Sequence, residues 1–158
     1  MLLAVLTALA VITLRLILYY SGSAPAGTDF LIVHFLALVT VVFFMDHRLL
    51  GSDRRTPFPT LMREGFKSAA VYALLIAVFI WFYFTAVDEH HFTQRVNDMV
   101  AKAVASGQSE QAIRPKLEQF FTPFNYTTIT FFALLISGAI NALLIAILHH
   151  KVLRRFRR

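Results

Sequence analysis

Ionisable and hydroxyl-bearing side chains inside apolar stretches are the residues of this chain best suited to chemistry. Four of them fall at a similar depth: Arg15, His34, Tyr83 and Thr130. At a helical rise of about 1.5 Å per residue, His34 lies about 6 Å inside the nearer end of its stretch. The layer holds a fixed cation and a histidine that titrates near neutrality, and Asp29 and Asp88 at its rim are available as counter-ions. We interpret this polar layer as a candidate proton or anion site, with simple hydration near the membrane surface as the alternative.

Small side chains recur at a four-residue spacing in the last apolar stretch. The group consists of Ser137, Gly138, Asn141 and Ala142. This small-x-x-x-small pattern lets another helix backbone approach closely, and the asparagine amide can hydrogen-bond across helices. We predict a helix-packing face here, either within a bundle or between protomers.

The sequence predicts neither a metal or cofactor site nor an enzyme. Two histidine pairs occur, His90-His91 and His149-His150, but adjacent helical residues point about 100° apart, and no His-Glu-x-x-His motif is present. Haem ligation needs two inward-facing histidines, and only His34 is clearly inside a stretch. The chain has no cysteine, Walker loop, dinucleotide fingerprint or nucleophile elbow. Every Asp and Glu falls in or beside a connection, so we expect no intramembrane carboxyl of the kind that relays protons.

The elements that position these residues are four long apolar stretches, at about 1–20, 30–46, 68–87 and 125–148. Hydrophobic residues make up 58% of the chain, against about 45–50% in soluble domains. Each stretch is long enough to cross most or all of a hydrocarbon core about 30 Å thick, where only helices satisfy their own backbone hydrogen bonds. We predict an all-α membrane protein in which one domain, 1–158, contains four transmembrane helices.

The distribution of Lys and Arg predicts the orientation of these helices. The connection 46–67 and the tail 149–158 each carry five basic residues, whereas the connection 21–29 carries none. Basic loops stay cytoplasmic, so we predict that both termini are inside. The Arg-rich tail is suited to nucleic acid or to anionic lipid. We interpret it as an anchor at the cytoplasmic leaflet, so the expected partner is the lipid bilayer and not nucleic acid.

Two connections carry helix signals of their own. In 46–67, Pro57 and Pro59 favour extended structure, and Thr60 is suited to cap the third membrane helix. The connection 88–124 predicts an amphipathic helical hairpin outside the membrane, with a first helix that ends at Ser106-Gly107 and a second that is capped by Ser109. Pro115 should kink the second helix or displace its start. This hairpin is suited to lie on the membrane, to cover the bundle or to bind a partner.

Several local motifs together resemble a known family. They are the tight first hairpin, the segment Glu64-Gly65-Phe66-Lys67, the aromatic exit Trp81–Phe84, the outer amphipathic helix, and Phe121-Thr122-Pro123 before a last helix that contains Gly and Ala. The arrangement resembles a bacterial inner-membrane family of unknown function, domain-of-unknown-function group forty-one ninety-nine. The resemblance implies a four-helix fold in the bacterial cytoplasmic membrane. It brings no known activity, cofactor or catalytic residue.

Two functions are compatible with these features. The first is a non-enzymatic accessory or scaffold subunit that contacts other membrane proteins, or a second copy of itself, through the outer hairpin and the Gly138 face. The alternative is a small oligomeric channel or carrier that uses the polar layer around Arg15 and His34.

Overall fold

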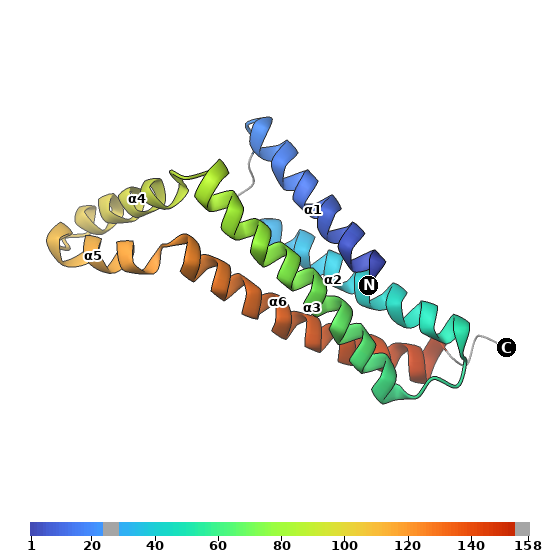
Figure 1. Cartoon of the computed structure of the whole chain (residues 1–158). Helices are drawn as coiled ribbons and strands as arrows, with labels where there is room; N and C mark the ends of the chain where they lie inside the picture. The colour runs from blue at the N-terminus through green and yellow to red at the C-terminus, as the bar shows by residue number, and fades with distance from the viewer. Residues whose placement is uncertain (24–28, 154–158) are drawn as a thin grey trace. The chain divides into compact units, whose positions relative to one another are not determined.

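The computed structural model describes residues 1–23 and 29–153, and all regular structure in those residues is helical. Six α-helices and two short π-helices follow one another along the chain (Figure 1): α1 (Leu2–Tyr20), α2 (Asp29–Ser52), α3 (Phe58–Phe82), η1 (Tyr83–Val87), α4 (His91–Ala105), α5 (Glu110–Phe120), α6 (Pro123–Ile147) and η2 (Leu148–Leu153).

Four helical stretches are long and apolar enough to cross a membrane. They are Leu2–Tyr20, Phe30–Ser52, Phe58–Val87 and Pro123–Leu153. The prediction of an all-helical fold with four helices suited to cross a membrane is therefore confirmed for the described residues.

The connection between the second and third membrane helices is much shorter than the sequence suggested. Helix α2 continues to Ser52 and α3 begins at Phe58. Pro59 occupies the first turn of α3, where its missing N–H costs no helical hydrogen bond. The Pro57 carbonyl accepts hydrogen bonds from the Thr60 and Leu61 amides at 3.1 and 3.3 Å. The prediction that Thr60 caps this helix was therefore wrong, since Thr60 lies inside α3.

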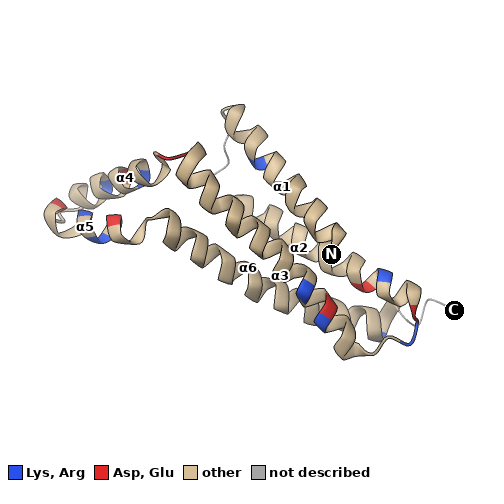
Figure 2. Cartoon of the chain, viewed as in Figure 1, with Lys and Arg blue, Asp and Glu red and all other residues tan. Residues whose placement is uncertain are grey.

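The chain forms two compact units, and the boundary between them falls within α3 and α6. The bundle unit comprises Met1–Ile76 and Phe132–Arg158, and the excursion unit comprises Ala77–Phe131. In the bundle unit, α1 and α2 form an antiparallel hairpin (Figure 1). Charged side chains of this unit gather where α2 ends and α3 begins, and most of its remaining surface is uncharged (Figure 2).

In the excursion unit, α4 and α5 pack against each other as a hairpin (Figure 1). Phe92, Val96 and Val100 of α4 are buried. Helix α4 ends at Ala105, and Gly107 adopts a φ of 87°, which reverses the chain as the Ser106-Gly107 signal predicted. Ser109 is the N-cap residue of α5, also as predicted. The helix begins at Glu110 and continues through Pro115, so the proline does not displace its start.

Candidate functional site in the bundle unit

A carboxyl group is buried in the core of the bundle unit. Asp46 of α2 is fully buried, and neither of its oxygens has a hydrogen-bond partner among the described residues. Its position follows from the helical repeat, because the buried residues of α2 recur at every fourth position: His34, Leu38, Val42, Asp46 and Leu50. The expectation that every acidic residue lies in or beside a connection was therefore wrong.

The backbone of α3 passes directly against Asp46 at Gly65. A Cβ atom placed on Gly65 would lie 3.4 Å from Asp46 Oδ1, 3.0 Å from Val42 Cγ1 and 3.5 Å from the Cβ of Ala142. Helices α2, α3 and α6 thus converge at this point. The carboxyl oxygen therefore lies close to the α3 backbone, at a point where the other nearest atoms to Gly65 are carbon atoms.

Another buried side-chain oxygen without a hydrogen-bond partner among the described residues belongs to α3, about one turn after Gly65. Ser68 is buried, and its Oγ has no hydrogen-bond partner in the described part of the chain. Gly65, Ser68 and Tyr72 follow one another at three- and four-residue spacings, so they share one face of α3. Buried polar groups are nearly always hydrogen-bonded, so two unsatisfied ones on adjoining faces require an explanation.

His34 is hydrogen-bonded to a residue that the sequence analysis did not single out. Its Nδ1 and the hydroxyl of Tyr72 are 2.8 Å apart, and both side chains are buried. The ring of Phe30 lies 5.3 Å from the ring of His34, and the Arg15 guanidinium lies over Phe30 at 5.0 Å from its centroid. The structure therefore brings Arg15 and His34 to the same place, with Phe30 between them.

The other members of the predicted polar layer are placed differently. Tyr83 and Thr130 belong to the excursion unit, so their association with His34 stays a prediction. The side chain of Asp29 lies outside the described residues. Asp88 pairs with His91 of its own unit, with 3.2 Å between Oδ2 and Nδ1.

A second histidine is buried at the far end of α6. His149, in η2, is fully buried, and its ring lies 4.7 Å from Phe43 and 6.1 Å from His47. The expectation that only His34 is clearly inside therefore needs correction. The described residues contain no cluster of three or more side chains suited to hold a metal ion.

The predicted packing face contacts its own chain. A Cβ on Gly138 would lie 2.7 Å from the Cβ of Ala69, so α3 and α6 approach as closely as this glycine permits. Asn141 donates to the Ser137 carbonyl at 2.9 Å, within its own helix and not across helices as predicted. Ala142 faces Gly65, as described above. This face therefore packs within the bundle.

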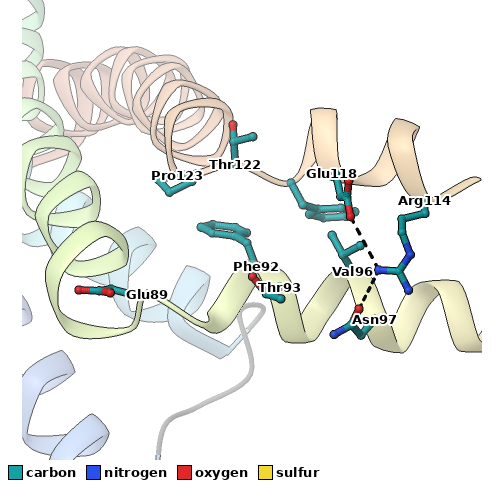
Figure 3. Close-up of a pocket in the computed structure, with 10 residues that line it drawn as sticks. Glu89, Phe92, Thr93, Val96, Asn97, Arg114, Glu118, Thr122 and Pro123 are labelled. Carbon is teal, nitrogen blue, oxygen red and sulfur yellow. Dashed lines mark hydrogen bonds and ion pairs between the residues drawn. The ribbon is translucent and has the colours of Figure 1, made fainter.

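The excursion unit carries a pocket of about 320 Å³ between α4 and α5 (Figure 3). Phe92, Val96 and Phe121 form apolar lining, while Glu89, Arg114 and Glu118 contribute charged lining. Arg114 donates to Asn97 Oδ1 at 2.9 Å and pairs with Glu110 and Glu118 at 2.8 and 3.7 Å. Because its guanidinium is already occupied by these acceptors, the pocket is poorly suited to bind an anion.

The sequence signal for Asp46 is visible in retrospect. The apolar pair Leu49-Leu50 continues the four-residue pattern of α2 beyond Asp46-His47-Arg48, so the helix could have been extended past these polar residues. Tyr72 and Ser68 carry a weaker signal, because isolated hydroxyl groups in an apolar helix often bond within it.

Comparison with known proteins places the chain in a family. A family model described as "Protein of unknown function (DUF4199)" matches residues 2–151. No curated protein and no solved structure matches the chain. The match covers nearly the whole sequence and confirms the resemblance that its local motifs indicated, and the chain therefore belongs to the DUF4199 family of proteins of unknown function.

Proposed function

We propose that this multi-pass membrane protein is a small channel or carrier, in which buried ionisable groups of the bundle handle the transported species. The observation that carries the proposal is Asp46, a fully buried carboxyl without a hydrogen-bond partner among the described residues. Ionisable residues inside membrane helices are costly, face the protein interior and commonly mark ion or proton pathways.

A purely structural role would leave Asp46 paired. The neighbouring cations Arg63 and Lys67 pair with Glu64 of α3, at 3.1 and 2.8 Å, and not with Asp46. A buried carboxylate costs several kcal/mol unless it is paired or hydrogen-bonded. An acid that stays buried without such partners is suited to exchange a small ligand.

Several buried polar groups of the bundle are spaced along the facing sides of α2 and α3, and Asp46 is one of them. Asp46 and His34 are twelve residues apart on the buried face of α2, which corresponds to about 18 Å. Facing them on α3, Ser68 and Tyr72 are one turn apart, and Tyr72 bonds to His34. This series extends through more than half of a hydrocarbon core that is about 30 Å thick.

Flux through proteoliposomes tests the proposal. With an imposed membrane potential and an internal pH dye, the wild type should acidify or alkalinise the lumen faster than empty vesicles. Asp46→Asn should abolish this flux, and Asp98→Asn, which removes an exposed acid of α4, should not. Absence of proton and common-ion flux in the wild type would contradict the proposal.

We further propose that the protein resides in the bacterial cytoplasmic membrane with both termini inside and the helical connection 88–124 outside. The support is the basic cluster around the α2–α3 connection (Figure 2), which belongs on the cytoplasmic side. The chain has no cysteine, so single cysteines report topology cleanly. An impermeant maleimide should label Ser109→Cys in intact cells and Ser52→Cys only after permeabilisation. The reverse pattern would invert the orientation.

A second candidate function is a non-enzymatic accessory or scaffold subunit. Three exposed aromatic residues of the excursion unit favour it: Trp81, Phe120 and Phe124. Exposed aromatic groups are typical of interface hot spots and also of membrane-interface belts. The Gly138 face supports this function less than expected, because Ala69 already occupies it.

Native mass spectrometry from gently extracted membranes separates these candidates. A stoichiometric partner, or a second copy, that is lost when Phe120 and Phe124 are replaced by Ser would support the accessory function. A chain that remains alone, in both wild type and variant, would contradict it. Both candidate functions are non-enzymatic and involve neither a cofactor nor nucleic acid.

A further inference from the structure

We infer that Asp46 is a proton-binding site, which holds a proton while α2, α3 and α6 are packed as in this structure and exchanges it when the contact at Gly65 opens. The inference rests on the proposed function and names the species that the bundle handles. A proton-binding role would explain why a carboxyl group is buried at this position without a hydrogen-bond partner among the described residues.

The surroundings of Asp46 exclude a metal cation as the occupant. Alkali and alkaline-earth ions need about six oxygen ligands. Here the space between Gly65 and Asp46 is narrow, because a single carbon added to Gly65 would lie 3.4 Å from Asp46 Oδ1 and 3.0 and 3.5 Å from the Val42 and Ala142 methyl carbons. Ser68, which shares this face of α3, offers a single hydroxyl oxygen. A proton needs neither the ligands nor the space.

Among residues 1–23 and 29–153, the charged groups near Asp46 make no hydrogen bond to its carboxyl. On α3, Glu64 bonds to Arg63 and Lys67 at the surface. On η2, the His149 ring packs against Phe43 and His150 lies 5.9 Å from the Phe58 ring. On α2 itself, His47 stacks on Phe43 and the Arg48 side chain is exposed. In the described part of the chain, none of these groups donates a hydrogen bond to Asp46.

A neutral acid explains why this geometry is tolerated. An ionised carboxyl in an apolar setting loses far more solvation than a protonated one, so a bound proton removes most of the cost. Release of the proton then requires water or a donor to reach the carboxyl. The close approach at Gly65 prevents such access until α2 and α3 separate, so proton release and helix movement are coupled.

Infrared difference spectroscopy of the full-length protein in nanodiscs tests the inference directly. A pH change should reveal the C=O band of a protonated carboxylic acid without a hydrogen-bond donor, which converts to carboxylate bands at alkaline pH. Above the midpoint, the band should fall about tenfold for each pH unit. Asp46→Asn should remove the band, and the exposed-acid control Asp98→Asn should retain it.

Two further measurements keep the inference falsifiable if Asp46→Asn folds poorly. Asp46→Leu replaces the acid with an apolar group, so it should unfold at no lower temperature than the wild type yet lack the band. Sodium chloride in place of choline chloride, at equal ionic strength, should leave the titration unchanged. A sodium-dependent shift would overturn the proton assignment, as would a carboxylate signal for Asp46 at every pH where the protein is folded.

The outcome also separates this inference from the proposed function. The Asp46 band together with no proton flux in liposomes would support the proton site and reject the channel or carrier. Proton flux that persists in Asp46→Asn, with no Asp46 band in the wild type, would reject the site and leave the transport function standing.

Discussion

Helix contacts in the bundle unit depend on small side chains, whereas those in the excursion unit depend on aromatic rings. In the bundle, Gly138 meets Ala69, Gly65 meets Ala142, and Ala4 of α1 is fully buried. In the excursion, the Phe84 ring lies 4.8–5.2 Å from the rings of three neighbours: His91, Phe92 and Tyr126. Lipid provides no hydrophobic force between helices, so close backbone approach must hold them, while buried rings add packing area and ring-to-ring contacts where the amphipathic helix α4 meets the ends of the apolar helices.

The two units also treat acidic residues differently. Asp88 and Glu110 of the excursion pair with His91 and Arg114 near its surface. Asp46 of the bundle is buried without such a partner. Glu64 of the bundle pairs with Arg63 and Lys67 in the same way as the acids of the excursion, so the difference between the units rests on Asp46.

The largest expected effect is on the aromatic cluster of the excursion. Phe84→Ala should destabilise this unit by about 3–5 kcal/mol, because a buried ring that lies close to four others is removed. Trypsin should then cleave after Lys102 and Lys116 faster than in the wild type, while the bundle resists. Phe82→Ala, which removes an exposed ring of the same helix, is the matched control. If Phe84→Ala accelerated cleavage of the bundle as much as cleavage of the excursion, the aromatic cluster would not stabilise the excursion alone.

Overpacking of the bundle should have the next largest effect. Gly138→Ala places a carbon 2.7 Å from the Ala69 Cβ and should cost about 1–3 kcal/mol, visible as a lower unfolding temperature in detergent. Gly51→Ala should not lower it, since nothing lies within 4 Å of that position. Combining Gly138→Ala with Ala69→Gly should recover most of the loss, because the pair exchanges which helix carries the methyl group. Failure of this rescue would show that Gly138 matters for another reason.

A smaller effect is expected from the hydroxyl that bonds to His34. Tyr72→Phe should destabilise the bundle by about 1 kcal/mol and shift the imidazole NMR resonances of His34, because it removes a buried hydrogen bond and leaves the ring nitrogen unpaired. Tyr20→Phe, at an exposed position of α1, should do neither. Unchanged His34 resonances in Tyr72→Phe would contradict the observed bond.

The smallest effect concerns surface ion pairs of the excursion. Arg114→Gln should cost less than about 1 kcal/mol, and this cost should shrink at high salt, because Arg114 and its acidic partners are partly exposed. Lys116→Gln, at an exposed position of the same helix, gives the baseline for loss of a positive charge. A salt-independent loss of several kcal/mol would mean that polar contacts, and not aromatic ones, hold this unit.

The sequence predicted the membrane helices and the excursion well because their signals are local. Long apolar runs indicate crossings, and Ser106-Gly107 ended α4 as expected from its turn chemistry. Asp46 was assigned to a connection because Asp46-His47-Arg48 interrupts the hydropathy of α2, and burial depends on packing against α3 and α6. The partner of His34 was equally hidden, since Tyr72 is 38 residues away and only the fold brings them together.

The one-sided burial of α1 has a consequence for how the protein is assembled in the cell. Only Ala4, Ala8 and Val11 of this helix are buried, while leucines such as Leu6 and Leu9 are exposed. Most of the α1 surface is therefore left for lipid, and a narrow strip of small residues makes its contact with the rest of the bundle. Insertion into the bilayer thus contributes more to the placement of α1 than its contacts with α2.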